Sequence, residues 1–279
     1  MKRRSIFSDA RFRAHLFASL NAAVQADEEL LTGAERALLS RILLWMLQAK
    51  TDGDATISEL LDFYNFCHQN VHRSHSQIYQ DLWVLCLLKE KREGYFVEFG
   101  ACDGEKLSNT LLLERDYNWS GILAEPNPVW HSKLVDARNC QVDFRCVADR
   151  TGAEIMFHHI PTMPELSRMQ HIVPRDIHER NGNRSVFEQF VVGTVSLNDL
   201  LVEHNAPKHI DYISIDTEGS ELSILQGFDF SSYYVQLFSV EHAGEASKRE
   251  AVRALLEANG YARWWPELSQ WDDWYVRVV

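Results

Sequence analysis

The spacing of hydrophobic residues changes after about the first third of the chain. Before that point, apolar residues recur at helical intervals, in stretches over residues 34–47, after Ser58 and over residues 76–91. Beyond it, short apolar runs alternate with amphipathic stretches, and this alternation is typical of a parallel sheet covered by helices on both faces. We therefore expect a helical N-terminal region over residues 1–92 and an α/β domain over residues 93–279.

Apolar runs in the second region predict strands, and the stretches between them predict helices. The expected strands are 95–99, 121–124, 142–146, 154–158, 212–215 and 237–241. The expected helices are 108–115, 129–135, 196–204 and 218–225. The last run, 275–279, predicts one more strand that pairs antiparallel at or near a sheet edge.

The interval 161–195 interrupts this alternation. It is rich in charged residues, His and Asn, and shows no clear period. Loops of this length in compact domains often serve a function, so we expect a substrate lid here. Its basic side chains favour either an acidic or phosphorylated substrate or pairing with nearby carboxylates. They are Arg168, His171, Arg175, His178, Arg180 and Arg184.

Composition and charge narrow the class of protein. The chain has 279 residues, of which 46% are hydrophobic and 24% charged, as in ordinary globular proteins. A net charge of −12 argues against a nucleic-acid backbone as substrate. The five cysteines show no C-x-x-C spacing, which indicates reduced thiols rather than a zinc site or disulfides. No apolar run has the length of a signal peptide or a membrane span, so we expect a cytoplasmic protein.

The strongest local signal is the sequence Tyr95-Phe-Val-Glu-Phe-Gly-Ala-Cys-Asp-Gly104, which predicts a buried strand ending in a glycine turn. Gly100 lets a ligand approach the backbone, and Glu125, at the tip of the next strand, can accept the hydroxyls of a ribose. The turn lacks the G-x-G-x-x-G pattern of dinucleotide sites, and Asp103 would repel a pyrophosphate. This charge favours a cationic cofactor such as S-adenosylmethionine, with Glu98 and Asp103 facing its methionine part.

A second polar cluster follows the sequence Ile213-Ser-Ile-Asp-Thr-Glu-Gly-Ser-Glu221. Asp216 and Glu218 come at the carboxyl end of one predicted strand, and Glu241 and His242 at the end of the next. Methyl transfer to an alcohol needs a general base or a metal ion, and these four residues are our catalytic candidates. Their donor atoms would suit magnesium or manganese. The alternative is that the two acids cap the following helix and the imidazole is solvated.

Six motifs occur in order between residues 74 and 245. They are Ser76-Gln77-x-x-x-Asp81, Phe96-Val-Glu-Phe-Gly-Ala-Cys-Asp-Gly104, Ser108-Asn-Thr110, Ala124-Glu-Pro-Asn-Pro128, Val195-Ser-Leu-Asn-Asp-Leu200 and Asp216-Thr-Glu-Gly-Ser-Glu221. Together they resemble the FkbM family of S-adenosylmethionine-dependent methyltransferases. The resemblance implies a Rossmann-like methyltransferase sheet with helices on both faces. It also implies O-methylation of a hydroxyl on a sugar, glycan or natural product.

The resemblance also implies which residues bind the cofactor. They are Gln77, Glu98, Gly100, Ala101, Asp103, Asn109, Glu125, Asn127, Ala148 and Asp216. Among them, Glu125 would hold the ribose and Ala148 the adenine edge, with Asn109 and Gln77 near the methionine end. The family commonly has Asp in place of Glu98 and a small residue or Asn in place of Cys102.

Two other functions remain open from the sequence. A nicotinamide-dependent oxidoreductase would also use a Rossmann-like sheet, although the glycine pattern argues against it. A non-catalytic interaction module would leave the carboxylates as helix caps. The sequence identifies neither the acceptor nor a need for a divalent ion, and it leaves a homo-oligomer open.

Overall fold

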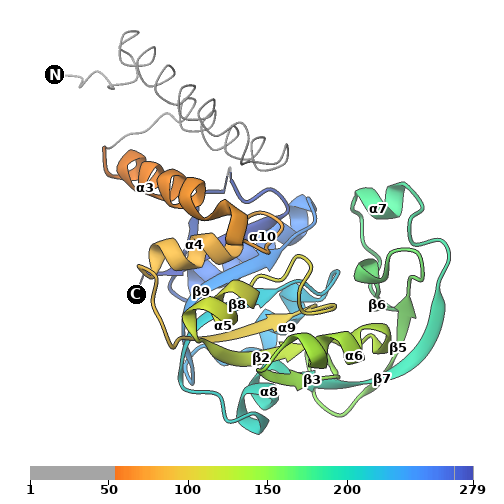
Figure 1. Ribbon diagram of the computed structural model, residues 1–279. Coiled ribbons are helices and arrows are strands. Elements are labelled where there is room, and N and C mark those ends of the chain that lie inside the picture. The colour runs from red at the N-terminus through yellow and green to blue at the C-terminus, as the bar shows by residue number, and fades with distance from the viewer. Residues whose placement is uncertain (1–53, 267, 279) are drawn as a thin grey trace. The chain divides into compact units, whose positions relative to one another are not determined.

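The computed structural model describes residues 54–266 and 268–278 (Figure 1). The chain divides into two compact units, Met1–Ser74 and His75–Val279. In the first unit, the helix expected after Ser58 is α3, Asp54–Asn70, and a short 3-10 helix, η2, follows over Val71–Arg73. The helix expected over 34–47 lies outside the described residues.

The helix expected over 76–91 is shorter in the structure and belongs to the second unit. It is α4, Gln80–Leu87. Trp83 of this helix is fully buried, stacks on Trp274 at 5.1 Å between ring centroids, and meets the edge of Tyr212. These aromatic contacts place α4 in the core of the α/β unit, so the units divide earlier in the chain than residue 92.

The main sheet has seven strands in the order β10-β11-β9-β8-β1-β2-β3. Their bounds are β1 Tyr95–Phe99, β2 Ser120–Ala124, β3 Gln141–Asp143, β8 His209–Ile215, β9 Tyr234–Glu241, β10 Tyr261–Trp264 and β11 Asp272–Arg277. Strands β3, β2, β1, β8 and β9 run parallel, while β11 pairs antiparallel with both β9 and β10. The chain leaves β1 toward β2 on one side and reaches β8 on the other. This reversal is the topological switch point at which open α/β sheets bind ligands.

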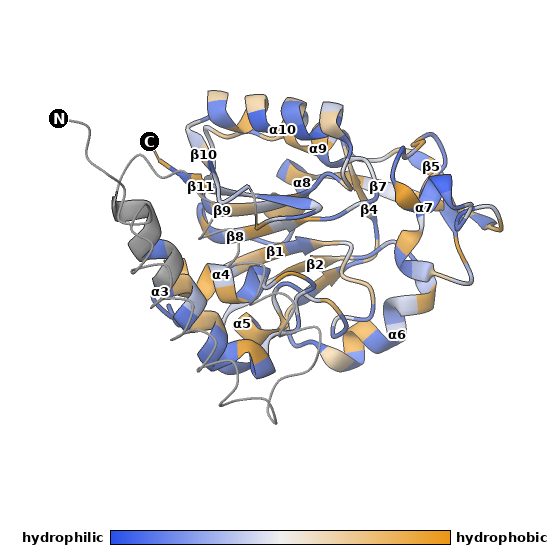
Figure 2. Ribbon diagram, turned by 90° about the horizontal axis from the view of Figure 1, so that it is seen from above, coloured by the Kyte–Doolittle hydropathy of each residue, from blue (hydrophilic) through white to orange (hydrophobic). Residues whose placement is uncertain are grey.

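Helices cover both faces of this sheet, as predicted (Figure 2). Helices α8, Leu197–Glu203, α9, Glu221–Gly227, and α10, Ala246–Ala258, pack on one face, and α4, α5, Leu111–Tyr117, and α6, Pro128–Ala137, lie on the other. Side chains alternate along β1: Val97 and Phe99 join the core under α8, α9 and α10, whereas Glu98 points to the other face. The expected Rossmann-like α/β fold is therefore confirmed.

A second sheet holds the segments that the sequence analysis assigned to the main alternation and the lid. Its order is β4-β7-β5-β6, with bounds Cys146–Ala148, Glu188–Ser196, Glu154–His159 and Arg168–Met169 respectively. The strand expected over 142–146 is split, because the chain leaves the main sheet after β3. The interval 161–195 is likewise ordered, and contains η3, Pro164–Leu166, the short helix α7, Ile177–Arg180, and most of β7.

None of the described helices combines the length and the apolar character that crossing a bilayer requires.

Candidate active site

A cavity of about 730 Å³ opens at the carboxyl ends of β1, β2, β8 and β9. Its walls include most of the residues that the sequence analysis selected. They are Gln77, Glu98, Gly100, Ala101, Asp103, Asn109, Glu125, Asp216, Glu218 and Glu241. Three selected residues, Asn127, Ala148 and His242, do not line it. The arrangement follows from the parallel strands, because their carboxyl ends meet at one edge of the sheet.

The conformation of the turn after β1 requires glycine at residue 100. Gly100 has a φ of +74°, and a Cβ there would lie 2.0 Å from the carbonyl oxygen of Asp216. The Gly100 N–H donates to Ala124 O at 3.0 Å, which ties the turn to β2. Asp103 closes the turn, because its Oδ1 accepts the N–H groups of Glu105 and Lys106. The backbone of residues 100–103 thus forms a fixed wall of the cavity.

Glu98 borders the cavity, yet its oxygens are directed to the protein. Oε1 accepts the Asn109 N–H at 2.7 Å, and Oε2 accepts the hydroxyls of Ser108 and Thr110. Arg138, which the sequence analysis missed, lies 3.8 Å from the same carboxylate. The acid therefore holds the loop 108–110 in place, and this use competes with the predicted contact to a methionine group.

Arg138 joins several chain segments behind the turn. Its side chain is fully buried, pairs with Glu114 at 2.7 Å, and donates to the carbonyl of Gly104 and the hydroxyls of Ser108 and Thr110. No local pattern could identify this residue, because its partners come from three different stretches of the sequence.

Glu125 ends β2 and is held by two backbone groups. Oε2 accepts the Cys102 N–H at 2.9 Å and Oε1 accepts the Asn127 N–H at 2.8 Å. Burial raises the pKa of Glu125 to about 7, although these two hydrogen bonds oppose the increase. Its carboxylate is thus fixed against the glycine turn, at the position predicted for an acid that binds a ribose.

Asn127, predicted to contact the cofactor, does not line the cavity. The Asn127 amide caps α6 by accepting the Val129 N–H, and its Nδ2 faces His159 and Ser167. Pro128 at the first helical position fixes this geometry. Asn127 acts on the site only through its backbone N–H, which orients Glu125.

Ala148, the residue expected at the adenine edge, also lies outside the main cavity. Cys146 and Val147 line the main cavity, whereas Ala148 lines a separate cavity of about 320 Å³. The first two residues of β4 thus border the main cavity, and its last residue, Ala148, lies beyond it.

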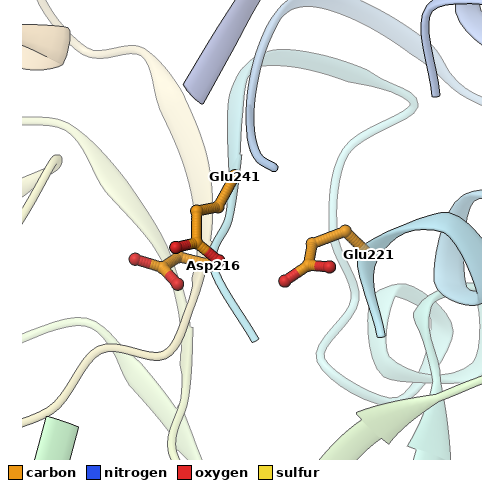
Figure 3. Close-up of side chains that lie close together, drawn as sticks. All are labelled: Asp216, Glu221 and Glu241. Carbon is orange, nitrogen blue, oxygen red and sulfur yellow. The ribbon is translucent and has the colours of Figure 1, made fainter. Parts of the chain in front are cut away.

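Three carboxylates gather at the ends of β8 and β9, close to the Gly100 turn (Figure 3). Asp216 follows β8, Glu241 ends β9, and Glu221 begins α9, with one oxygen of each lying within 4.8 Å of the others. Glu221 was part of the sixth motif but not among the predicted site residues. Its Oε1 accepts the N–H groups of Thr217 and Gly219, which shapes the turn after β8.

Lys248 on α10 supplies the positive charge at this cluster. Its Nζ lies 3.1 Å from Glu221 and 3.9 Å from Glu241. Burial lowers the pKa of Lys248, but the charges of Glu221 and Glu241 outweigh burial and raise it above the usual value. The Lys248 side chain is therefore positively charged at neutral pH. The sequence carries no signal for this residue, since only the packing of α10 brings it to β9.

Crowding of the acids separates their pKa values. Burial and the charge of Glu221 raise the pKa of Asp216 to about 6, while Lys248 and a hydrogen bond with Glu241 oppose the increase. Burial, followed by the charge of Asp216, raises the pKa of Glu218 to about 8, and the pKa of Glu241 is well above its usual value for the same reasons. At neutral pH Asp216, with a pKa of about 6, is therefore largely ionised, and Glu241 resists ionisation beside it.

His242 is not a catalytic candidate in the structure. The ring is buried: Nδ1 accepts the Gly244 N–H at 3.0 Å, and Nε2 donates to the carbonyl of Asp272 at 3.1 Å. Burial lowers its pKa to about 4, so the imidazole stays neutral. Because successive residues at a strand end point to opposite faces, Glu241 reaches the cavity and His242 does not.

The segment 161–184 crosses the ends of β8 and β9 and forms another wall. Buried Arg184 pairs with Asp176 at 2.8 Å and also with Glu218. Ile172 lies over Gly219, where a Cβ would come within 2.4 Å of its Cγ2. The Arg175 N–H donates to Glu245 at 2.7 Å. These contacts tie the segment to the turns that follow β8 and β9, and its role as a lid stays a prediction.

Comparison with protein families decides the class of this site. Residues 98–262 match the model of the methyltransferase FkbM domain, and this range includes the glycine turn and the acidic cluster. The chain belongs to the FkbM methyltransferase family. Membership confirms the resemblance drawn from the six motifs and identifies the protein as a methyltransferase rather than a nicotinamide-dependent oxidoreductase.

Comparisons outside the family show only distant likeness to the FkbM chain. No curated protein matches it. Among solved structures, the fibrillarin/Nop5p complex matches with 10% identity and a TM-score of 0.35, covering 73% of this chain and 81% of that one. A putative sarcosine dimethylglycine methyltransferase from Galdieria sulphuraria has 11% identity and a TM-score of 0.30, over 66% and 61% of the two chains. The CurJ carbon methyltransferase has 11% identity and a TM-score of 0.38, over 95% and 71%.

Proposed function

We propose that this FkbM protein transfers the methyl group of S-adenosylmethionine to a hydroxyl of a sugar, glycan or natural-product acceptor. The observation that carries the proposal is the placement of Asp216 and Glu241 side by side in a cavity bordered by the Gly100 turn and Glu125. An alcohol has a high pKa, so its methylation calls for a nearby base, and Asp216 is the residue that offers one at neutral pH.

The residues of the cavity fit S-adenosylmethionine. Glu125 supplies a fixed carboxylate beside a glycine turn, as a ribose site requires. The side-chain oxygen of Asn109 is buried, borders the cavity and has no hydrogen-bond donor among the described atoms. One carboxylate oxygen of Glu241 is likewise buried and has no hydrogen-bond donor among the described atoms. Buried acceptors without donors are costly, and the ammonium group of the cofactor is a donor that would satisfy them.

Each residue then has a defined role. When bound, S-adenosylmethionine supplies an electrophilic methyl group on a sulfonium. Glu125 accepts the ribose hydroxyls, and the acidic wall favours the positive charge of the ligand. Asp216 accepts the proton of the acceptor hydroxyl, and the hydrogen bond between Asp216 and Glu241 stabilises the Asp216 carboxylate. The segment 161–184 closes the cavity over the acceptor and excludes water.

The proposal is tested by incubating the protein with isotopically labelled methyl donor and a pool of sugars, glycans and natural products. We expect mass spectrometry to find the label on a hydroxyl oxygen of one acceptor class. Label on carbon or nitrogen would contradict O-methylation. Calorimetry with NADH and S-adenosylhomocysteine is the companion test, and binding of NADH alone would refute the cofactor assignment.

We expect Glu125→Ala to weaken binding of S-adenosylhomocysteine by roughly 1–3 kcal/mol, the contribution of hydrogen bonds to a charged group. Titration calorimetry measures this change. Glu105→Ala is the matched control, because Glu105 is exposed on the same loop and pairs with Arg115, away from the cavity lining. Thermal unfolding of both variants shows whether the turn stays folded. Equal affinities for the two variants would argue against a ribose at Glu125.

A divalent ion is a separate question, because Asp216, Glu221 and Glu241 offer a set of oxygen ligands. Lys248 already neutralises part of this charge, at 3.1 Å from Glu221. We therefore expect methyl transfer to continue at an unchanged rate after exhaustive treatment with EDTA. A rate that falls with EDTA and returns with added Mg²⁺ or Mn²⁺ would instead show that the cluster binds a metal during turnover.

A further inference from the structure

The charges around the cavity are strongly unequal. Eight carboxylic side chains line it: Glu98, Asp103, Glu125, Glu165, Asp176, Asp216, Glu218 and Glu241. Lys106 and Arg180 are the lysine and arginine in the same walls. Neither forms an ion pair with a carboxylate of the described residues, although many acids are near. Both cations are therefore free to bind an anionic group of a ligand.

The guanidinium of Arg180 is held in a geometry that suits an anion. Its Nε donates to the backbone carbonyl of Asp176 at 3.2 Å, which fixes the plane of the guanidinium. Its two terminal nitrogens have no acceptor among the described residues. A guanidinium held in this way presents two parallel N–H groups, the geometry that matches a carboxylate or a phosphate.

The other arginines of this segment are committed elsewhere. Arg184 pairs with Asp176 and Glu218, and Arg168 donates to the carbonyls of Met169 and Ile172. Arg175 is exposed and does not line the cavity. Arg168 and Arg184 therefore hold the segment in place, whereas Arg180 is the arginine of this segment that lines the cavity.

Both unpaired cations lie on the rim of the cavity. Lys106 and Arg180 are exposed. Leu107, next to Lys106, and Ile177, at the other end of α7 from Arg180, are 45% and 53% exposed and also line the cavity. The wall near Glu125 is deep in comparison, since Glu125 is only 4% exposed. A rim is where an acceptor enters and leaves, while the deep wall suits the cofactor.

We propose that Lys106 and Arg180 form a subsite for an anionic group of the acceptor, a carboxylate or a phosphate. This inference rests on the proposed function and adds the class of acceptor, a hydroxyl compound that carries a negative charge. The two cations offset the repulsion that the acidic walls would otherwise exert on such a molecule. They also orient it, because the anion is bound at the rim while a hydroxyl of the same molecule reaches Asp216.

The test is calorimetry on the full chain saturated with S-adenosylhomocysteine. Inorganic phosphate, glucose 6-phosphate and glucose are titrated into the wild type and into Arg180→Gln, Lys106→Gln and Arg175→Gln. Arg175→Gln is the matched control, since it removes the same charge from the same segment outside the cavity. We expect the wild type to bind glucose 6-phosphate more tightly than glucose. Arg180→Gln and Lys106→Gln each weaken phosphate binding by about tenfold, the loss of a charge-assisted hydrogen bond.

Three results would overturn the subsite: no phosphate binding by the wild type, equal weakening in Arg175→Gln, or phosphate binding unchanged in the two cavity variants. Weaker binding of S-adenosylhomocysteine by Arg180→Gln would also overturn it, because the cations would then hold the carboxylate of the cofactor. Failure of the wild type to bind S-adenosylhomocysteine refutes the proposed function instead, and phosphate titration into the ligand-free protein then still measures the subsite.

Discussion

Asp216→Asn lowers the rate of methyl transfer by about 10²–10⁴-fold, the usual contribution of a general base. Asparagine keeps the size of the side chain and cannot accept the proton of the acceptor hydroxyl. We expect the loss in kcat, measured with labelled methyl donor under saturating conditions, while the affinity for S-adenosylhomocysteine changes little.

The pH dependence of the methyl-transfer rate is a second test of Asp216. Because the pKa of Asp216 is raised to about 6, the base is ionised above that pH and protonated below it. The wild-type rate therefore falls as the pH decreases through about 6, and this limb disappears in Asp216→Asn. The observed value belongs to the coupled pair of Asp216 and Glu241.

Asp136→Asn is the control for this prediction, because Asp136 is exposed on α6 and does not line the cavity. It removes an equal charge and should leave both the rate and the pH profile unchanged. Full activity of Asp216→Asn would exclude the proposed base. So would a matching fall in Asp136→Asn, which would point to net charge as the cause.

Arg138→Met destabilises the protein by about 3–5 kcal/mol, the range measured when one partner of a buried ion pair is removed. The Arg138 side chain is fully buried and is held by Glu114, while Glu98 lies 3.8 Å away. Methionine fills much of the volume but leaves two buried carboxylates without their cation. Urea unfolding followed by circular dichroism measures the change in the free energy of unfolding.

Arg115→Met provides the comparison, since Arg115 pairs with Glu105 at 2.7 Å but both side chains are about half exposed. Exposed pairs contribute about 0–1 kcal/mol, so this variant should unfold close to the wild type. If the two variants lose similar stability, the buried network around Glu98 has no special role in the fold.

The sequence alone determined the positions of the central strands of the main sheet. It also determined which polar residues follow those strands at the site. Strands β1, β2, β8 and β9 begin and end within a few residues of their predicted bounds, because apolar runs closed by glycine or acidic residues are local signals. Since parallel strands bring their carboxyl ends to one edge, this pattern also placed Gly100, Glu125, Asp216, Glu218 and Glu241 around one cavity.

Tertiary structure decided which polar groups face one another. Arg138 and Lys248 come from helices distant in sequence, and only packing brings them to Glu98 and Glu221. His242 follows directly after Glu241, yet the direction of the chain after β9 turns it to backbone partners. The path of β4 places its first two residues at the main cavity and Ala148 beyond it. The spacing of apolar residues indicates the secondary structure of each segment. Which side chains from distant segments contact one another depends on how those segments pack.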